Sequence, residues 1–121
     1  MSVPTNEEDS RIRAVFGHSN NDPIPRVSHE TLLKYREFLV ANLSFPFEAL
    51  YADTMPPVRQ LVRYVVVIGL SDTHHRLDGL LCQVRNTQGE IEMPLAALGV
   101  REENPNHQLV DDYAYWFWNW R

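Results

Sequence analysis

The chain has 121 residues, of which 44% are hydrophobic and 22% are charged, as expected for one globular domain. Its net charge of −5 argues against a nucleic-acid-binding protein, because such proteins usually carry a basic face. The single cysteine, Cys82, excludes an intramolecular disulfide and any zinc site built from several cysteines.

The chain also lacks the features of a membrane or secreted protein. No stretch approaches the roughly 18 consecutive apolar residues that are needed to span a bilayer. The first ten residues, MSVPTNEEDS, are polar and acidic, unlike a signal peptide. One cysteine in an apolar run fits a reducing compartment. We therefore expect a cytoplasmic protein without membrane association.

Residues 1–27 are predicted to be a poorly ordered N-terminal extension, because they contain few apolar residues and show no periodicity. Residues 28–121 are predicted to form the single domain. Its first element is a helix with Ser28 as the N-cap. The apolar residues of this helix recur at helical spacing: Leu32, Tyr35, Leu39 and Leu43.

Pro46 must stop this helix, because proline disfavours helical geometry in the residue before it. The neighbouring phenylalanines, Phe45 and Phe47, are therefore predicted to form an extended hydrophobic hook. Directly behind this hook the chain places a carboxylate, Glu48. A hook anchored in the core would hold that carboxylate on a rigid support.

The middle of the chain predicts three antiparallel strands. LVRYVVVIGL, residues 61–70, is rich in β-branched residues. LLCQVRN, residues 80–86, and EIEMPL, residues 90–95, alternate in polarity, and Asn86 to Gly89 between them reads as a hairpin turn. A short helical turn ending at Gly99 and a polar loop, residues 101–108, follow.

YAYWFWNW, residues 113–120, is predicted to be a final aromatic strand. Tyr113, Tyr115 and Phe117 would share one face of it. A strand this apolar needs cover on both faces. Packing in the core is favoured over an exposed aromatic face that binds a protein partner, but both interpretations stay open. The predicted fold is α+β: an N-terminal helix packed on a small, curved antiparallel sheet that resembles an SH3-like barrel.

The acidic residues of the predicted domain fall mainly in connections, where they could meet around a cation. Asp72 and Asp78 bracket the first hairpin loop, and Asp111 and Asp112 precede the aromatic strand. Ca²⁺ takes six to eight oxygen ligands from flexible segments, so such loops suit it. Composition alone is a weak signal, because most loop carboxylates are simply solvated. An EF-hand is excluded, because the positions that should hold oxygen ligands after Asp72 carry His74 and Arg76.

Other chemistries find less support in the sequence. A zinc site at the loop that contains His74 and His75 would need Asp72, Asp78 or His107 to converge on it, and metal-assisted hydrolysis there ranks last. Phosphate-binding loops and nucleophile motifs are absent from the sequence. We therefore expect a protein that is not an enzyme.

Four stretches resemble the CcbP-type family of cyanobacterial calcium-binding proteins. They are LLKYREFLVANLSFPFEALY, VVIGLSD, GLLCQVRNTQGEIEMPLAAL and NPNHQLVDDYAYWFWNW, and together they extend over residues 30–121. The resemblance implies Ca²⁺ binding without an EF-hand, in buffering or signalling. It matches Glu48, Asp72, Asp111 and Asp112 to acids of the family pattern. With Asp78, these four are the expected calcium ligands.

The sequence departs from that pattern in its charge. A net charge of −5 is modest for such a family, and the loop after Asp72 carries His74, His75 and Arg76. Each added positive charge weakens a cation site. The alternative function is therefore a metal-free interaction module that uses the aromatic segment.

Overall fold

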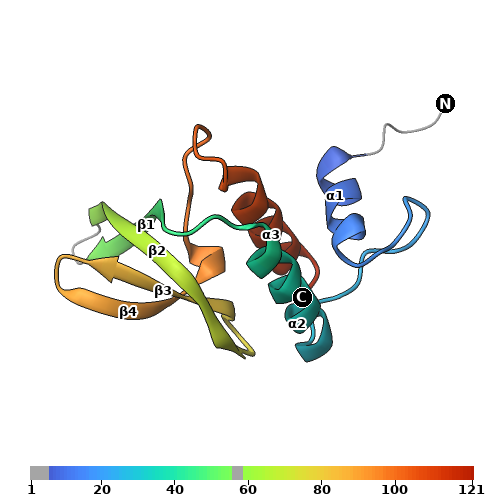
Figure 1. Ribbon diagram of the computed structural model, residues 1–121, viewed down its shortest axis with the longest axis horizontal. Coiled ribbons are helices and arrows are strands. Elements are labelled where there is room, and N and C mark those ends of the chain that lie inside the picture. The colour runs from blue at the N-terminus through green and yellow to red at the C-terminus, as the bar shows by residue number, and fades with distance from the viewer. Residues whose placement is uncertain (1–5, 56–58) are drawn as a thin grey trace.

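The computed structural model describes residues 6–55 and 59–121. Helices α2 and α3 lie between a four-stranded sheet and helix α1 (Figure 1). The elements follow in chain order: α1 (Glu7–Val15), α2 (His29–Asn42), β1 (Phe47–Met55), β2 (Arg59–His75), β3 (Gly79–Asn86), β4 (Gly89–Pro94), the 3₁₀ turn η1 (Leu95–Ala97) and α3 (His107–Asn119). None of the helices in these two ranges is long and apolar enough to cross a membrane.

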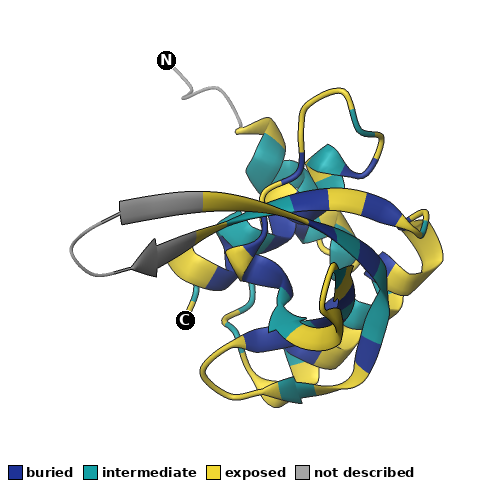
Figure 2. Cartoon of the chain, turned by 90° about the vertical axis from the view of Figure 1, so that its left-hand side faces the viewer, coloured by how far each residue is buried: buried dark blue, intermediate teal, exposed yellow. Residues whose placement is uncertain are grey.

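The sheet is an antiparallel meander in the order β1-β2-β3-β4. It curves strongly (Figure 2), and the pairing of the long strand β2 with β3 shifts in register between Val67 and Gly69 and again between Leu70 and His74. Such irregularities bend a strand and increase its twist. The edge of β1 is partly covered by Gly99, which exchanges two backbone hydrogen bonds with Leu50. The sheet is open, since no ladder joins β1 to β4 within the described strands.

The predicted α+β class is confirmed, and so is the helix that opens the predicted domain. Ser28 and Thr31 form a reciprocal capping box at the start of α2. Such a box satisfies two backbone N–H groups that have no partner within the helix. The predicted apolar side of the helix is buried, with Tyr35 and Leu39 almost fully enclosed.

The predicted aromatic strand is wrong, because those residues form helix α3. Val110, Tyr113, Trp116 and Phe117 are all fully buried, and their spacing places them on one face of a helix. Aromatic residues favour a strand by intrinsic propensity, but here the helical spacing lets them pack against Tyr35. The ring centroids of Tyr35 and Trp116 lie 4.9 Å apart.

The predicted disorder of residues 1–27 is also corrected for residues 6–27. Asn6 caps α1 by accepting a hydrogen bond from the backbone N–H of Glu8, and Ile12 of this helix is completely buried. The segment after α1 packs as well, since the indole Nε1 of Trp116 donates to the carbonyl of Pro25 at 2.8 Å. The N-terminal segment is thus part of the packed body, where it lies beside α2 and α3 (Figure 1).

Candidate metal site

Three carboxylates meet where α1 packs against α3. Glu8 comes from the first turn of α1, and Asp111 and Asp112 come from the first half of α3. One oxygen from each lies within 4.8 Å of the other two. Asp111 is exposed, Glu8 is half-buried and Asp112 is buried. The group, called here the acidic cluster, therefore opens to solvent on one side and rests on the core on the other.

Arg11 is the counter-charge of this cluster. Its Nε donates to one oxygen of Asp112 at 2.7 Å, and its Nη2 donates to the other at 3.0 Å. This bidentate geometry is the strongest form of an arginine–carboxylate pair. Arg11 lies three residues after Glu8, so both side chains project from the same side of α1 towards α3. Arg11 of α1 therefore already compensates the negative charge of Asp112, the more buried of the two acids of α3.

The electrostatics of the cluster show that its negative charge is only partly compensated. Burial, a hydrogen bond to Asp112 and the charges of Asp112 and Asp111 raise the pKa of Glu8 from 4.5 to about 7, although Arg11 lowers it. Crowded carboxylates raise each other's pKa in this way because two like charges cannot both ionise cheaply. A bound divalent cation would remove that cost.

The other three predicted ligands lie elsewhere on the surface. Asp72 is fully exposed and pairs with Arg36 at 3.1 Å. Asp78 lies in the turn after β2, 3.4 Å from His75. Neither belongs to the acidic cluster, and Glu48 does not belong to it either. The expected convergence of these loops with Asp111 and Asp112 required a strand after residue 112, and the helix found there removes the basis for it.

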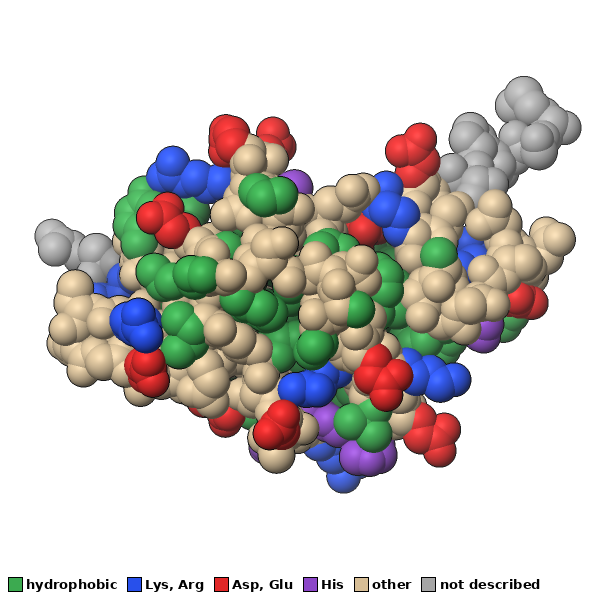
Figure 3. All heavy atoms as spheres, in the orientation of Figure 1, with side chains coloured by type: hydrophobic (Ala, Val, Ile, Leu, Met, Phe, Trp, Pro, Cys, Tyr) green, Lys and Arg blue, Asp and Glu red, His purple; other side chains and the backbone are tan. Residues whose placement is uncertain are grey.

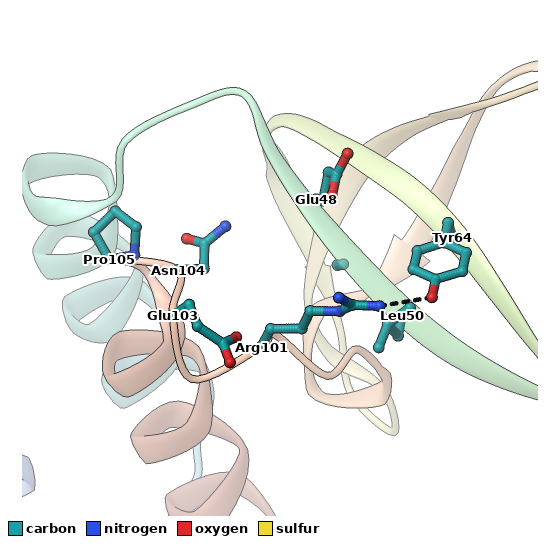
Figure 4. Close-up of a pocket in the computed structure, with 8 residues that line it drawn as sticks. Glu48, Leu50, Tyr64, Arg101, Glu103, Asn104 and Pro105 are labelled. Carbon is teal, nitrogen blue, oxygen red and sulfur yellow. Dashed lines mark hydrogen bonds between the residues drawn. The ribbon is translucent and has the colours of Figure 1, made fainter.

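Glu48 lines a separate hollow of about 450 Å³ between β1, β2 and the loop before α3 (Figure 4). Arg101 reaches across this hollow and donates to the hydroxyl of Tyr64 at 2.7 Å. A second acid, Glu103, also lines it, but among the described residues no group of three metal-binding side chains gathers there. The arginine also makes this hollow a poor cation site.

The alternative zinc site is not assembled in the described part of the chain. Asp78 lies 3.4 Å from His75, but among the described residues no three of the possible ligands come together: His74, His75, Asp72, Asp78 and His107. The ring of His107 instead hydrogen-bonds the carbonyl of Val100 at 2.6 Å.

Glu8 is not among the predicted ligands, because it lies in residues 1–27, which are predicted to be a poorly ordered extension. The stretch NEEDSRIRAVF does carry a helix signal. An asparagine suited to cap a helix precedes three acids in the first turn, and Ile12, Val15 and Phe16 follow at helical spacing.

Two comparisons with known proteins found a match. A family model described as calcium binding, Calci_bind_CcbP, matches residues 26–117. The chain belongs to this family. The crystal structure of CcbP from Anabaena is similar, with a TM-score of 0.65 and 18% sequence identity, over 95% of this chain and 93% of that one. No curated protein matched the sequence.

Family membership and the structural match confirm the predicted resemblance and the α+β fold. The family also confirms Ca²⁺ as the ion to consider. The structural match includes most of residues 1–27, since it leaves only about 5% of the chain uncovered. The acidic cluster fits that ion, because carboxylate oxygens are the ligands that Ca²⁺ prefers.

Proposed function

We propose that this member of the family binds Ca²⁺ at the acidic cluster and acts as a calcium buffer or signalling protein rather than as an enzyme. The observation that carries the proposal is the convergence of three carboxylates, Glu8, Asp111 and Asp112, from two helices that are far apart in the sequence. Family membership supports the choice of ion.

The three side chains offer up to six oxygens, and Ca²⁺ takes six to eight. Backbone carbonyls and water would complete the shell. The exposed carboxylate of Asp111 lets an ion enter from solvent, and the buried carboxylate of Asp112 is held in place by the core. Arg11 competes with the ion for Asp112. Binding therefore requires the arginine to release or share this carboxylate, which lowers the affinity.

The test is a Ca²⁺ titration of metal-stripped protein by calorimetry and amide NMR, with Mg²⁺ as the control ion. Glu8→Gln keeps the size of the side chain and removes one charged ligand. We expect this variant and Asp111→Asn each to weaken Ca²⁺ binding about tenfold or more.

Asp78→Asn is the matched control, because it removes the same charge from the far end of β2. Unchanged affinity in both Glu8→Gln and Asp111→Asn would refute the proposed site. Equal losses in all three variants would mean general charge screening rather than a site.

The alternative function, a protein-interaction module that uses the aromatic segment, has less support. Tyr113, Trp116 and Phe117 are fully buried, which leaves Trp118 as the exposed ring, with 56% of its surface accessible. The aromatic residues of α3 therefore serve mainly as core. A protein partner and a cytoplasmic location stay predictions.

A further inference from the structure

A second group of metal-binding side chains lies where the start of α2 meets the end of β2, apart from the acidic cluster. His29 is the first residue of α2, and His74 lies near the end of β2. The Nδ1 atom of His29 and the Nε2 atom of His74 are 2.9 Å apart. Figure 3 shows histidine side chains gathered at the lower edge of the molecule.

The two ring nitrogens share a single proton. At 2.9 Å one of them must donate and the other must accept, so the contact exists only while at least one ring is neutral. Burial and the charge of His29 lower the pKa of His74, which favours its neutral form. Neutral imidazole nitrogen is the form that binds metals, and a metal ion can displace the shared proton when both rings turn their lone pairs towards it.

We propose that His29 and His74 bind one divalent transition-metal ion that prefers tetragonal nitrogen and oxygen coordination, Cu²⁺ or Ni²⁺. Two imidazole nitrogens bound at right angles, each about 2.0–2.1 Å from a metal, lie about 2.9 Å apart. That separation already exists in the protein. A tetrahedral ion such as Zn²⁺ would have to open the pair to about 3.3 Å.

The surroundings leave room for the remaining ligands. The pair borders a hollow of about 450 Å³ that is also lined by Val27, Ser28 and Arg76. No third histidine, cysteine or acid joins the pair within the described ranges, so water fills the other coordination positions. Arg76 opposes a cation there, but it can hold a small anion as a further ligand.

This site differs from the acidic cluster in its chemistry. Carboxylates select Ca²⁺, whereas imidazole selects copper, nickel and zinc. The proposal therefore does not depend on the calcium site, and each can fail without the other.

The experiment is a Cu²⁺ titration of the metal-stripped full chain in excess CaCl₂, which occupies carboxylate sites. Calorimetry gives the affinity, and electron paramagnetic resonance counts the bound nitrogens. We expect one ion with coupling to two imidazole nitrogens. His29→Gln and His74→Gln should each weaken binding at least about tenfold.

His75→Gln is the matched control, because His75 is the neighbour of His74 but turns towards Asp78. Its Cu²⁺ affinity should not change. The substitutions should leave the fold intact, since His29 is exposed and His74 is only half-buried; an unchanged circular dichroism spectrum checks this. Unchanged Cu²⁺ affinity in His29→Gln or His74→Gln, or an equal loss in His75→Gln, would overturn the proposal. A loss caused by Glu8→Gln would place the ion in the acidic cluster and overturn it as well.

Discussion

Replacing Arg11 by glutamine should move stability and calcium affinity in opposite directions. Arg11 makes two short hydrogen bonds to Asp112, whose side chain is only 8% exposed. Breaking a fully buried ion pair costs about 3–5 kcal/mol. The Arg11 side chain is 39% exposed, however, so water screens part of the interaction. We therefore expect Arg11→Gln to lower the free energy of unfolding of the calcium-free protein by about 1–3 kcal/mol.

The same change removes the cation that competes with Ca²⁺ for Asp112. Two unit charges 4 Å apart interact by about 1 kcal/mol in water and about 4 kcal/mol near a protein surface. Loss of one positive charge beside the ion should therefore strengthen binding by at least about 1.4 kcal/mol, which is about tenfold in the dissociation constant.

Urea denaturation in a chelator measures the first effect, and calorimetric Ca²⁺ titration measures the second. Arg13→Gln is the matched control. It removes the same charge from the same helix, but Arg13 donates to the backbone carbonyl of Asp22 instead of the acidic cluster. Weaker Ca²⁺ binding by Arg11→Gln would refute the competition argument. An equal gain in Arg13→Gln would show that only the net charge matters.

Two further predictions concern pH and packing. The raised pKa of Glu8 means that the folded, calcium-free protein holds this proton more tightly than the unfolded chain, so its stability should fall as pH rises from about 4.5 to about 7. Urea denaturation in a chelator at several pH values should show this slope, and Glu8→Gln should remove that part of it; an identical slope in the variant would contradict the assignment. Gly79 has φ +73°, and a Cβ there would lie 2.5 Å from the hydroxyl of Tyr113 and 2.6 Å from a ring carbon of Phe117. Gly79→Ala should therefore destabilise the protein by about 2 kcal/mol or more in urea denaturation, whereas Gly17→Ala, also at positive φ but with open space around it, should cost less.

The parts of the fold that were predicted correctly are those where local pattern and tertiary packing agree. The helix after Ser28 has both a cap and an apolar side, and the hairpin at Asn86 to Gly89 has a glycine with φ 126° at its turn. The segment of α3 satisfies two patterns at once. Its aromatic residues have a high strand propensity, yet Val110, Tyr113 and Phe117 also fall on one side of a helix. Only the core against which they pack decides between the two patterns.

Only two of the three acids in the candidate site could be predicted from the sequence, for a similar reason. The position of Asp111 and Asp112 before the aromatic segment and the resemblance to the family both indicate these two acids, but the sequence indicates further ligands only within the predicted domain. The third acid, Glu8, is on α1, a helix of nine residues that is too short to be stable alone. Burial of Ile12 against the rest of the protein stabilises it. Such support is a tertiary effect, and local periodicity shows little of it.

Glu8 lies outside the residues that match the family model, whereas the other two acids of the cluster lie inside them. The family match covers residues 26–117, which include Asp111 and Asp112 but not Glu8. The three acids are brought together as a site by their proximity alone. If Asp111→Asn abolishes Ca²⁺ binding and Glu8→Gln does not, the ion is held by α3 without α1. If both variants lose Ca²⁺ binding, the ion links α1 to α3, as the ion pair of Arg11 and Asp112 also does. In that case Ca²⁺ should also raise the protection of α1 amides against hydrogen exchange, because an ion bound to Glu8 stabilises the docked helix.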